Sequence, residues 1–109
     1  MVVMKFGGTS VKDPEAVQRL ARIVVREQGL SGVPVVVVSA MSGITDQLLD
    51  AVSAVERGDA GLASQKVTVM RDRHRAAAEA LLQGAARDEV VDALERQWRE
   101  AASLLHAMA

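Results

Sequence analysis

A lysine and a glycine pair follow the first apolar stretch of the chain, a pattern that suits phosphate binding. Val2–Met4 predicts a short strand, and residues 5–10 then read KFGGTS. Glycines let the backbone approach a ligand closely because they carry no Cβ atom. The N–H groups of such a turn favour an anion, and the mobile ammonium group of Lys5 adds a positive charge. The stretch therefore predicts a phosphate-binding turn.

This first loop is a weak signal when it is taken alone. It is not a Walker A loop, because no Gly-Lys-Ser/Thr follows, and it is not the GxGxxG dinucleotide fingerprint. An ordinary tight turn, with Lys5 on a solvated face, stays open as the alternative.

A second loop with small and hydroxyl-bearing residues strengthens the prediction. Val35–Val38 is a continuous β-branched run, typical of a strand buried on both faces of a parallel sheet, and residues 39–45 then read SAMSGIT. The carboxyl ends of parallel strands lie at one edge of a sheet, so both loops are expected to face one crevice. The second loop would offer the hydroxyls of Ser39, Ser42 and Thr45. Helix capping by Thr45 is the alternative, and both roles can hold at once.

The segments around these loops predict a βαβ unit followed by a helix, over residues 1–58. The helices are expected at residues 14–28 and about 45–57, ended by Gly29 and Gly58, with Asp13 as the N-cap of the first. Residues 59–109 then predict an antiparallel helical hairpin, because two apolar stripes with helical spacing are joined by a short connection. The fold class is therefore α/β, a βαβ start with a helical remainder.

The hairpin is expected to be helical from about Leu62, with a break at Gly84 and a last helix capped by Asp88. Its stripes are Val67, Met70, Ala77 and Leu81, and then Val91, Leu94, Trp98, Ala101, Leu105 and Met108.

The remaining polar side chains have ordinary structural explanations. Asp46 is expected to stabilise the first turn of its helix rather than to act as a catalytic carboxylate. The basic run at 71–75 is expected to be solvated and balanced by neighbouring acids, and Trp98 to fill the centre of the hairpin. Neither His74 nor His106 has a partner at metal-ligand spacing, so no metal site is predicted.

Composition limits the classes of function. The 109 residues are 50% hydrophobic, which suits one small globular domain. A net charge of -1 gives no drive toward nucleic acid or an anionic membrane. No apolar run approaches the ~20 residues of a membrane span, and no disulfide framework is possible without cysteine. We expect a cytoplasmic protein, and an open sheet edge with an apolar hairpin favours a homo-oligomer.

The two loop motifs together resemble those of the aspartokinases. Residues 5–11, KFGGTSV, are similar to the opening motif of that family, and residues 35–46, VVVVSAMSGITD, are similar to a second segment of it. Their order and spacing also fit, and the helical stretch after Gly58 resembles the helical part of the catalytic domain in character. The resemblance implies an amino-acid kinase fold of the carbamate kinase-like type, with a parallel-rich sheet between helices.

The resemblance also implies an activity. Aspartokinases transfer the γ-phosphoryl group of ATP to the side-chain carboxylate of aspartate with Mg2+, which is the first step of lysine, threonine and methionine biosynthesis. By resemblance, Lys5 would be the catalytic residue that holds the transferring phosphoryl group, and Gly7 and Gly8 would offer N–H groups to phosphate oxygens. Ser10 would be an additional phosphate-binding or loop-shaping residue. The aspartate would contact Ser39 and Thr45.

Length is where the chain departs from the family pattern. A complete catalytic domain of this family is much longer, so residues 1–109 are expected to be its N-terminal part. Most groups that bind ATP and Mg2+ would then lie elsewhere, and the fragment alone is expected to be inactive. The alternatives are another amino-acid kinase, acting on glutamate, carbamate or a nucleoside monophosphate, a non-catalytic anion-binding module that self-associates, and a purely structural role of the last helix.

Overall fold

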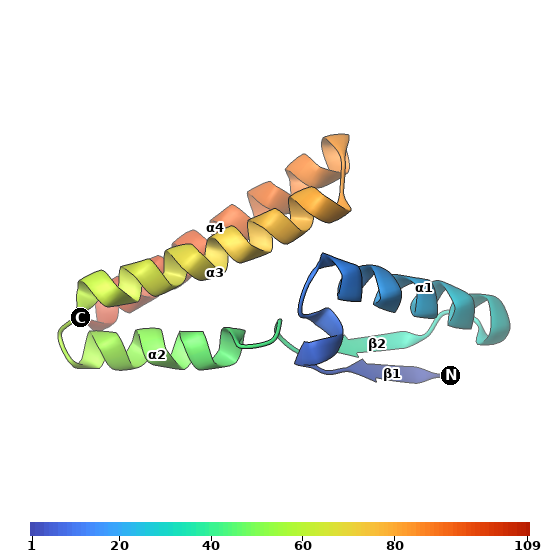
Figure 1. The fold of residues 1–109 in the computed structure, drawn as a ribbon, viewed down its shortest axis with the longest axis horizontal. Coiled ribbons are helices and arrows are strands. Elements are labelled where there is room, and N and C mark those ends of the chain that lie inside the picture. Colours follow the sequence, from blue (N-terminus) through green and yellow to red (C-terminus); the bar gives the residue numbers. More distant parts are fainter. The chain divides into compact units, whose positions relative to one another are not determined.

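The computed structural model describes all residues, Met1–Ala109, which form two compact units, Met1–Gly43 and Ile44–Ala109 (Figure 1). The first unit contains β1 (Val3–Phe6), the 3-10 helix η1 (Gly8–Val11), α1 (Pro14–Ser31) and β2 (Val35–Val38). The second unit contains α2 (Ile44–Glu56), α3 (Ala60–Leu81) and α4 (Gly84–Met108). The predicted α/β class, with a βαβ start and a helical remainder, is confirmed.

The two strands of the first unit pair in parallel. Val3 lies opposite Val35, and Phe6 lies opposite Val38. Two further hydrogen bonds extend the ladder at its ends, from Val35 N–H to the Val2 carbonyl (2.9 Å) and from Ser39 N–H to the Phe6 carbonyl (3.1 Å). The carboxyl ends of both strands therefore lie at one edge of the sheet, as predicted.

Helix α1 begins as predicted but ends later. The side chain of Asp13 caps it by accepting a hydrogen bond from Ala16 N–H at 2.8 Å. The prediction that Gly29 ends the helix was wrong, because α1 runs to Ser31. A glycine inside a helix costs only about 1 kcal/mol relative to alanine, which the surrounding helix tolerates. The left-handed backbone falls instead on Gly32, with a φ of 84°.

Strand β2 is exposed on both faces in this chain, which corrects the prediction that it is buried. Its four valines retain 38–54% of their accessible surface. Side chains alternate between the faces of a strand, so Met4 and Phe6 lie on one face and Val3 and Lys5 on the other. Phe6 lines a pocket together with α1 residues, which identifies its face as the α1 side. The opposite face carries Val3, Lys5 and two β2 valines, and we call it the Lys5 face.

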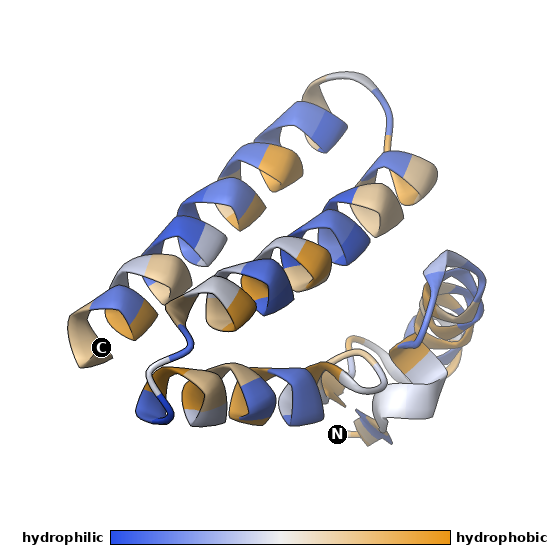
Figure 2. Ribbon diagram, turned by 60° about the vertical axis from the view of Figure 1, so that its left-hand side comes forward, coloured by the Kyte–Doolittle hydropathy of each residue, from blue (hydrophilic) through white to orange (hydrophobic).

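The second unit is a three-helix unit in which α3 contacts both α2 and α4. Apolar residues recur along each helix between polar ones (Figure 2). Small side chains dominate the core, which lets the helices pack closely. Its buried residues are Ile44, Ala51, Ala54, Val55, Ala63, Val67, Met70, Ala78 and Leu105. No helix of the structure has the length and apolar character needed to cross a bilayer.

Several predicted boundaries in the second unit shift. Helix α2 belongs to the second compact unit, Ile44–Ala109, because it packs on α3 and α4. Gly58 ends α2 as predicted, with a φ of 81°. Asp59 then caps α3 through Leu62 N–H at 3.0 Å, so this helix starts before Leu62. The expected cap Asp88 lies inside α4 instead, where its carboxylate pairs with Arg87 at 3.2 Å.

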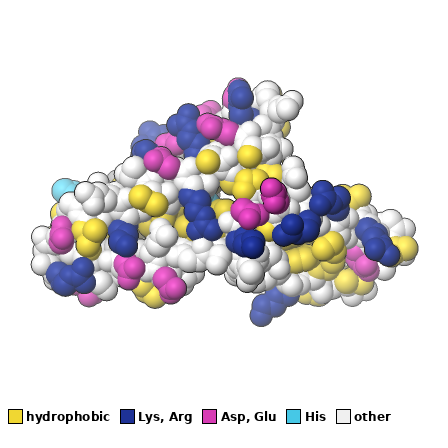
Figure 3. All heavy atoms as spheres, in the orientation of Figure 1, with side chains coloured by type: hydrophobic (Ala, Val, Ile, Leu, Met, Phe, Trp, Pro, Cys, Tyr) yellow, Lys and Arg dark blue, Asp and Glu magenta, His cyan; other side chains and the backbone are white.

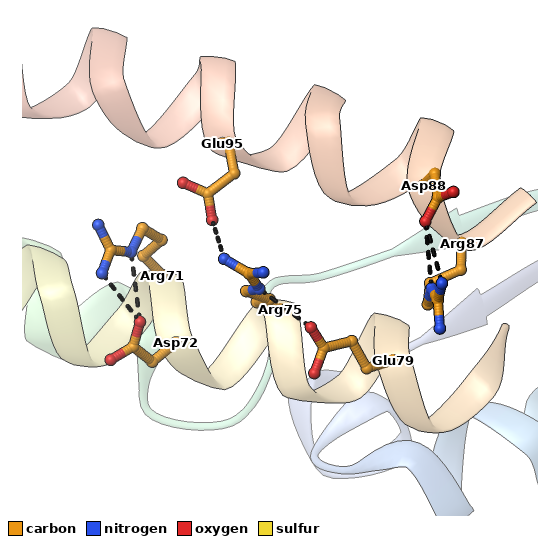
Figure 4. A network of polar contacts seen from close by, with 7 residues as sticks. All are labelled: Arg71, Asp72, Arg75, Glu79, Arg87, Asp88 and Glu95. Atoms are coloured by element: carbon orange, nitrogen blue, oxygen red, sulfur yellow. Dashed lines mark hydrogen bonds and ion pairs between the residues drawn. The ribbon is translucent and has the colours of Figure 1, made fainter. Parts of the chain in front are cut away.

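Polar contacts surround the α3–α4 hairpin (Figure 4). Arg75 pairs with Glu79 one turn along α3 at 3.0 Å and reaches Glu95 of α4 at 3.5 Å. The hydrogen bond and charge of Glu79 raise the pKa of Arg75 above its usual value. Beside this pair, the half-buried ring of His74 lies 5.1 Å from that of Trp98. The predicted balance of the basic run by Asp72 and Glu79 is confirmed. Trp98 lies within the hairpin but stays half-buried, and the fully buried side chain of this core is that of Met70 instead.

Met70 tests this core, because its side chain has 0% exposure while that of its neighbour Val69 has 58%. We expect Met70→Ala to lower the free energy of unfolding by about 2–5 kcal/mol, since it leaves a cavity among three helices. The matched control Val69→Ala should change it by about 0.5 kcal/mol or less. Urea unfolding followed by circular dichroism measures both, and similar losses would contradict this packing.

Candidate phosphate-binding site

The loops that follow β1 and β2 touch each other. A Cβ atom placed on Gly8 would lie 3.1 Å from the Ala40 carbonyl oxygen and 3.4 Å from the Ser42 Cα. Both neighbours are backbone atoms, which cannot swing aside as a flexible side chain would. A larger residue at position 8 would therefore push this backbone away by a few tenths of an ångström. The predicted meeting of the two loops is confirmed for residues 8 and 40–42.

Lys5 lies opposite Val37 near the carboxyl end of the two paired strands. Its side chain is exposed on the face of the sheet that is opposite to α1. It makes no hydrogen bond and no ion pair within the chain. An ammonium group without a protein partner can neutralise a bound anion without first breaking an existing contact. Lys5 is thus available for the role that its sequence position predicts.

The N–H groups of Gly7 and Gly8 are likewise unoccupied. Neither donates a hydrogen bond within the chain, whereas the Ser10 N–H donates to the Gly7 carbonyl at 3.0 Å. This bond closes the first turn of η1. The glycine pair therefore presents two free donors immediately after Lys5, and oriented backbone donors of this kind suit a phosphate oxygen.

Ser39 and Ser10 lie beside this loop but in different settings. Ser39 follows β2 directly, is exposed, and donates a hydrogen bond from Oγ to the Ala40 carbonyl at 3.3 Å. Ser10 lines the pocket on the α1 side together with Phe6, away from the Lys5 face. The geometry therefore favours a loop-shaping role for Ser10, and phosphate binding by its side chain stays a prediction.

Thr45 lies in the second unit, in the first turn of α2 and exposed. Because α2 begins at Ile44, Thr45 is inside the helix and is not the residue that caps it, which corrects the capping alternative. Asp46 also lies in that first turn, as predicted. An aspartate-binding role of Thr45 stays a prediction.

The residues of the first unit fit a phosphate group better than they fit a metal ion. Free N–H donors and an unpaired lysine match the oxygens and charge of a phosphate. The chain contains no group of three His, Cys, Asp or Glu side chains close enough to hold a metal ion. Any Mg2+ at the phosphates would therefore need ligands other than a cluster of these 109 residues.

Sequence reasoning missed Arg19, which lines the same pocket as Ser10 and Phe6. A signal was present in the helical spacing, because Arg19 and Ile23 follow Ala16 at three and seven residues on one face of α1. Only the packing of α1 near η1 brings this face to the loop.

Comparison with known proteins decides the family. The model of the amino acid kinase family matches residues 1–107, nearly the whole chain. The chain belongs to the amino acid kinase family. This match includes the helical second unit, for which the sequence motifs gave only a similarity of character.

The relatives are aspartokinases. The chain is 39% identical over 94 residues to a bifunctional aspartokinase/homoserine dehydrogenase 1 of Arabidopsis thaliana, covering 86% of this chain and 10% of the relative. It is 48% identical over 50 residues to the aspartokinase of Mycolicibacterium smegmatis, covering 46% of this chain and 12% of the relative. The aspartokinase of Rickettsia prowazekii is 43% identical over 49 residues, which are 45% of this chain and 11% of the relative. The resemblance drawn from the motifs is confirmed, and the chain spans roughly a tenth of these relatives' length.

Gly8 and Gly7 offer a matched test of the loop geometry. Gly8→Ala forces a Cβ to within 3.1 Å of the Ala40 oxygen, whereas a Cβ on Gly7 meets no atom within 4 Å. We expect Gly8→Ala to shift the amide resonances of residues 39–43 and to weaken binding of inorganic pyrophosphate several-fold. Gly7→Ala should leave residues 39–43 unshifted. Two-dimensional NMR during a pyrophosphate titration measures both effects, and unshifted resonances in Gly8→Ala would contradict the contact.

Proposed function

We propose that this chain supplies the phosphate-binding part of an aspartate kinase, an enzyme that transfers the γ-phosphoryl group of ATP to the side-chain carboxylate of L-aspartate. One observation carries the proposal. The unoccupied N–H groups of Gly7 and Gly8 follow directly after Lys5, which has no partner of its own. Family membership and the aspartokinase relatives support the choice of substrate class.

In the proposed reaction, this part of the chain would position the phosphate groups of ATP and supply positive charge. A carboxylate oxygen of aspartate attacks the γ-phosphorus, the bond from that phosphorus to the β–γ bridging oxygen breaks, and ADP leaves with the electron pair. Phosphoryl transfer depends mainly on alignment and on stabilisation of charge on the phosphoryl oxygens. Lys5 would neutralise part of that charge, while Gly7 and Gly8 would hold phosphate oxygens through their N–H groups. Mg2+, when bound, would supply further positive charge.

Three hydroxyl-bearing residues take secondary roles in the proposal. Ser39 and Thr45 would contact the aspartate through their hydroxyls, and both are exposed. Ser10 would shape the phosphate loop through its N–H bond to the Gly7 carbonyl. The proposed enzyme would act in the cytoplasm as a homo-oligomer, at the start of lysine, threonine and methionine biosynthesis.

A second candidate is a non-catalytic anion-binding module that self-associates. The exposure of all four β2 valines favours it, because an uncovered apolar strand promotes association. The two candidates share the phosphate loop and differ in catalysis. Kinases of the same family that act on glutamate, carbamate or a nucleoside monophosphate remain alternatives for the substrate, and competition among these acceptors would separate them.

Lys5→Met tests the phosphate-binding role, with Lys66→Met as a charge-matched control. Lys66 lies in α3, where it pairs with Asp50 at 3.7 Å. We expect Lys5→Met to weaken pyrophosphate binding about tenfold, the loss of one charge-assisted contact of about 1.4 kcal/mol. Lys66→Met should leave affinity unchanged. Isothermal titration calorimetry gives the dissociation constants, and equal affinities of the two variants would overturn this role of Lys5.

The 109-residue chain itself should form no aspartyl phosphate from ATP and aspartate, because it lacks a cluster of metal ligands and spans roughly a tenth of its relatives. Trapping the acyl phosphate with hydroxylamine gives a coloured hydroxamate that can be measured directly. Pyrophosphate binding that requires Lys5, together with absence of hydroxamate, is the expected result. Turnover by this chain would show that the prediction of inactivity was wrong.

A further inference from the structure

We propose that a pocket on the α1 side of the first unit binds a small amphipathic organic anion, meaning a carboxylate or phosphate group on an apolar body. The pocket has a volume of about 280 Å³. Three segments converge on it: β1 through Phe6, the η1 region through Thr9, Ser10 and Lys12, and one face of α1. All of them belong to the same compact unit.

The apolar part of the pocket comes from Phe6, Leu20 and Ile23. Ile23 and Leu20 share a helix face with Ala16, since they follow it by seven and four residues. Ile23 keeps 48% of its surface exposed, so apolar area remains that a ligand could cover. Burying such area is favourable by roughly 25 cal/mol per Å². In Figure 3, Lys and Arg atoms border a hydrophobic area on the right-hand part of the molecule, where Figure 1 draws α1.

The polar rim of the pocket is cationic and rich in hydroxyl groups. Thr9, Ser10, Lys12 and Arg19 form it, and no Asp or Glu lines the pocket. Arg19 makes no hydrogen bond and no ion pair within the chain. A free guanidinium binds carboxylate or phosphate in a two-pronged manner, and nearby hydroxyls can donate to the same oxygens.

The acidic groups nearby in sequence leave the guanidinium of Arg19 without an ion-pair partner. The carboxylate of Asp13 accepts the capping hydrogen bond from Ala16 N–H, and that of Glu27 accepts from the Ser31 hydroxyl. Glu15 lies one turn before Arg19 without forming an ion pair with it. The first unit thus carries five basic residues against three acidic ones in residues 1–43, which favours an anionic ligand.

This pocket lies on the other side of the sheet from Lys5, the lysine of the proposed phosphate-binding loop. Side chains alternate along β1, so Lys5 lies on the face of the sheet opposite Phe6. The size of the pocket, together with its apolar interior, selects a ligand with an apolar body over a bare inorganic ion. The inference does not rest on the proposed kinase function, since it uses neither Lys5 nor the N–H groups of Gly7 and Gly8.

Binding of phenyl phosphate and benzoate to the 109-residue chain tests the proposal. Inorganic phosphate serves as the probe for the charged group alone, and phenol as the probe for the apolar body alone. We expect saturable shifts of the Thr9 and Ser10 amides and of the Ile23 methyl groups by NMR with the two amphipathic anions. Their affinities should exceed those of inorganic phosphate and phenol at least fivefold. The stronger of the two amphipathic probes identifies the charged group that the pocket prefers.

Arg19→Gln and Arg26→Gln form the matched pair of variants. Both arginines are exposed on α1, but only Arg19 lines this pocket. We expect Arg19→Gln to weaken phenyl phosphate binding at least fivefold, and Arg26→Gln to change it less than twofold. Arg19→Lys should retain part of the affinity, which excludes loss of fold as the cause. Equal losses in the Gln variants, or binding of inorganic phosphate as tight as that of phenyl phosphate, would overturn the proposal. So would binding that Lys5→Met abolishes and Arg19→Gln leaves intact, because the ligand would then occupy the phosphate loop.

Discussion

The parallel pairing of β1 with β2 is the constraint on which the loop geometry depends. Hydrogen bonds at both ends of the ladder, from Val35 N–H to Val2 and from Ser39 N–H to Phe6, hold the register over only four residues in each strand. This register ends both strands at the same edge. The Gly8 backbone then meets the Ala40 carbonyl closely enough that no larger residue fits without displacement. Two short sequence motifs far apart in the chain thereby become one surface.

The same ladder divides the chemistry of the first unit between two faces. Lys5 and Phe6 are neighbours in sequence, yet strand alternation directs one toward the open face and the other toward α1. The glycine pair follows β1 directly, and its second member, Gly8, is the first residue of η1. An anion on the Lys5 face would use backbone donors and an ammonium group, whereas an anion on the α1 side would meet hydroxyls and a guanidinium. The two proposed anion sites therefore differ in the groups that would bind the ligand.

Local signals made much of this architecture predictable. Asp13 caps the start of α1 through its side chain, and Gly58 ends α2 through its backbone conformation. Both effects depend only on neighbours in sequence, and both occur where they were predicted. Two helix ends were misplaced: Gly29 lies inside α1 because a single glycine costs a helix only about 1 kcal/mol, and Asp88 lies inside α4 because that helix already begins at Gly84. The burial of β2 was misjudged for a different reason. A run of valines indicates that a strand is suited to burial. It does not indicate whether other residues of these 109 pack on the strand.

The candidate site was predictable in its residue types and less so in its geometry. The motifs singled out Lys5, Gly7 and Gly8, and the structure adds that their donors are unoccupied. The position of Ser10 on the α1 side was not predictable from the sequence, because it depends on the 3-10 helix η1 that contains this residue. Arg19 escaped notice because its helical spacing from Ala16 does not by itself show that this face of α1 lies beside η1. Its significance arises only from the elements that surround it.

The four uncovered valines of β2 have a consequence for how the chain behaves in concentrated solution. A stretch of β-branched residues without charge, continuing into Ser39 and Ala40, has the composition of segments that stack into cross-β fibrils. Pro34 interrupts the stretch on one side only. Heating or slow refolding would expose the backbone of this segment to copies of itself, so loss of the native state would be governed by the rate of unfolding rather than by an equilibrium. A partner that covered these valines would therefore also protect the chain from irreversible precipitation.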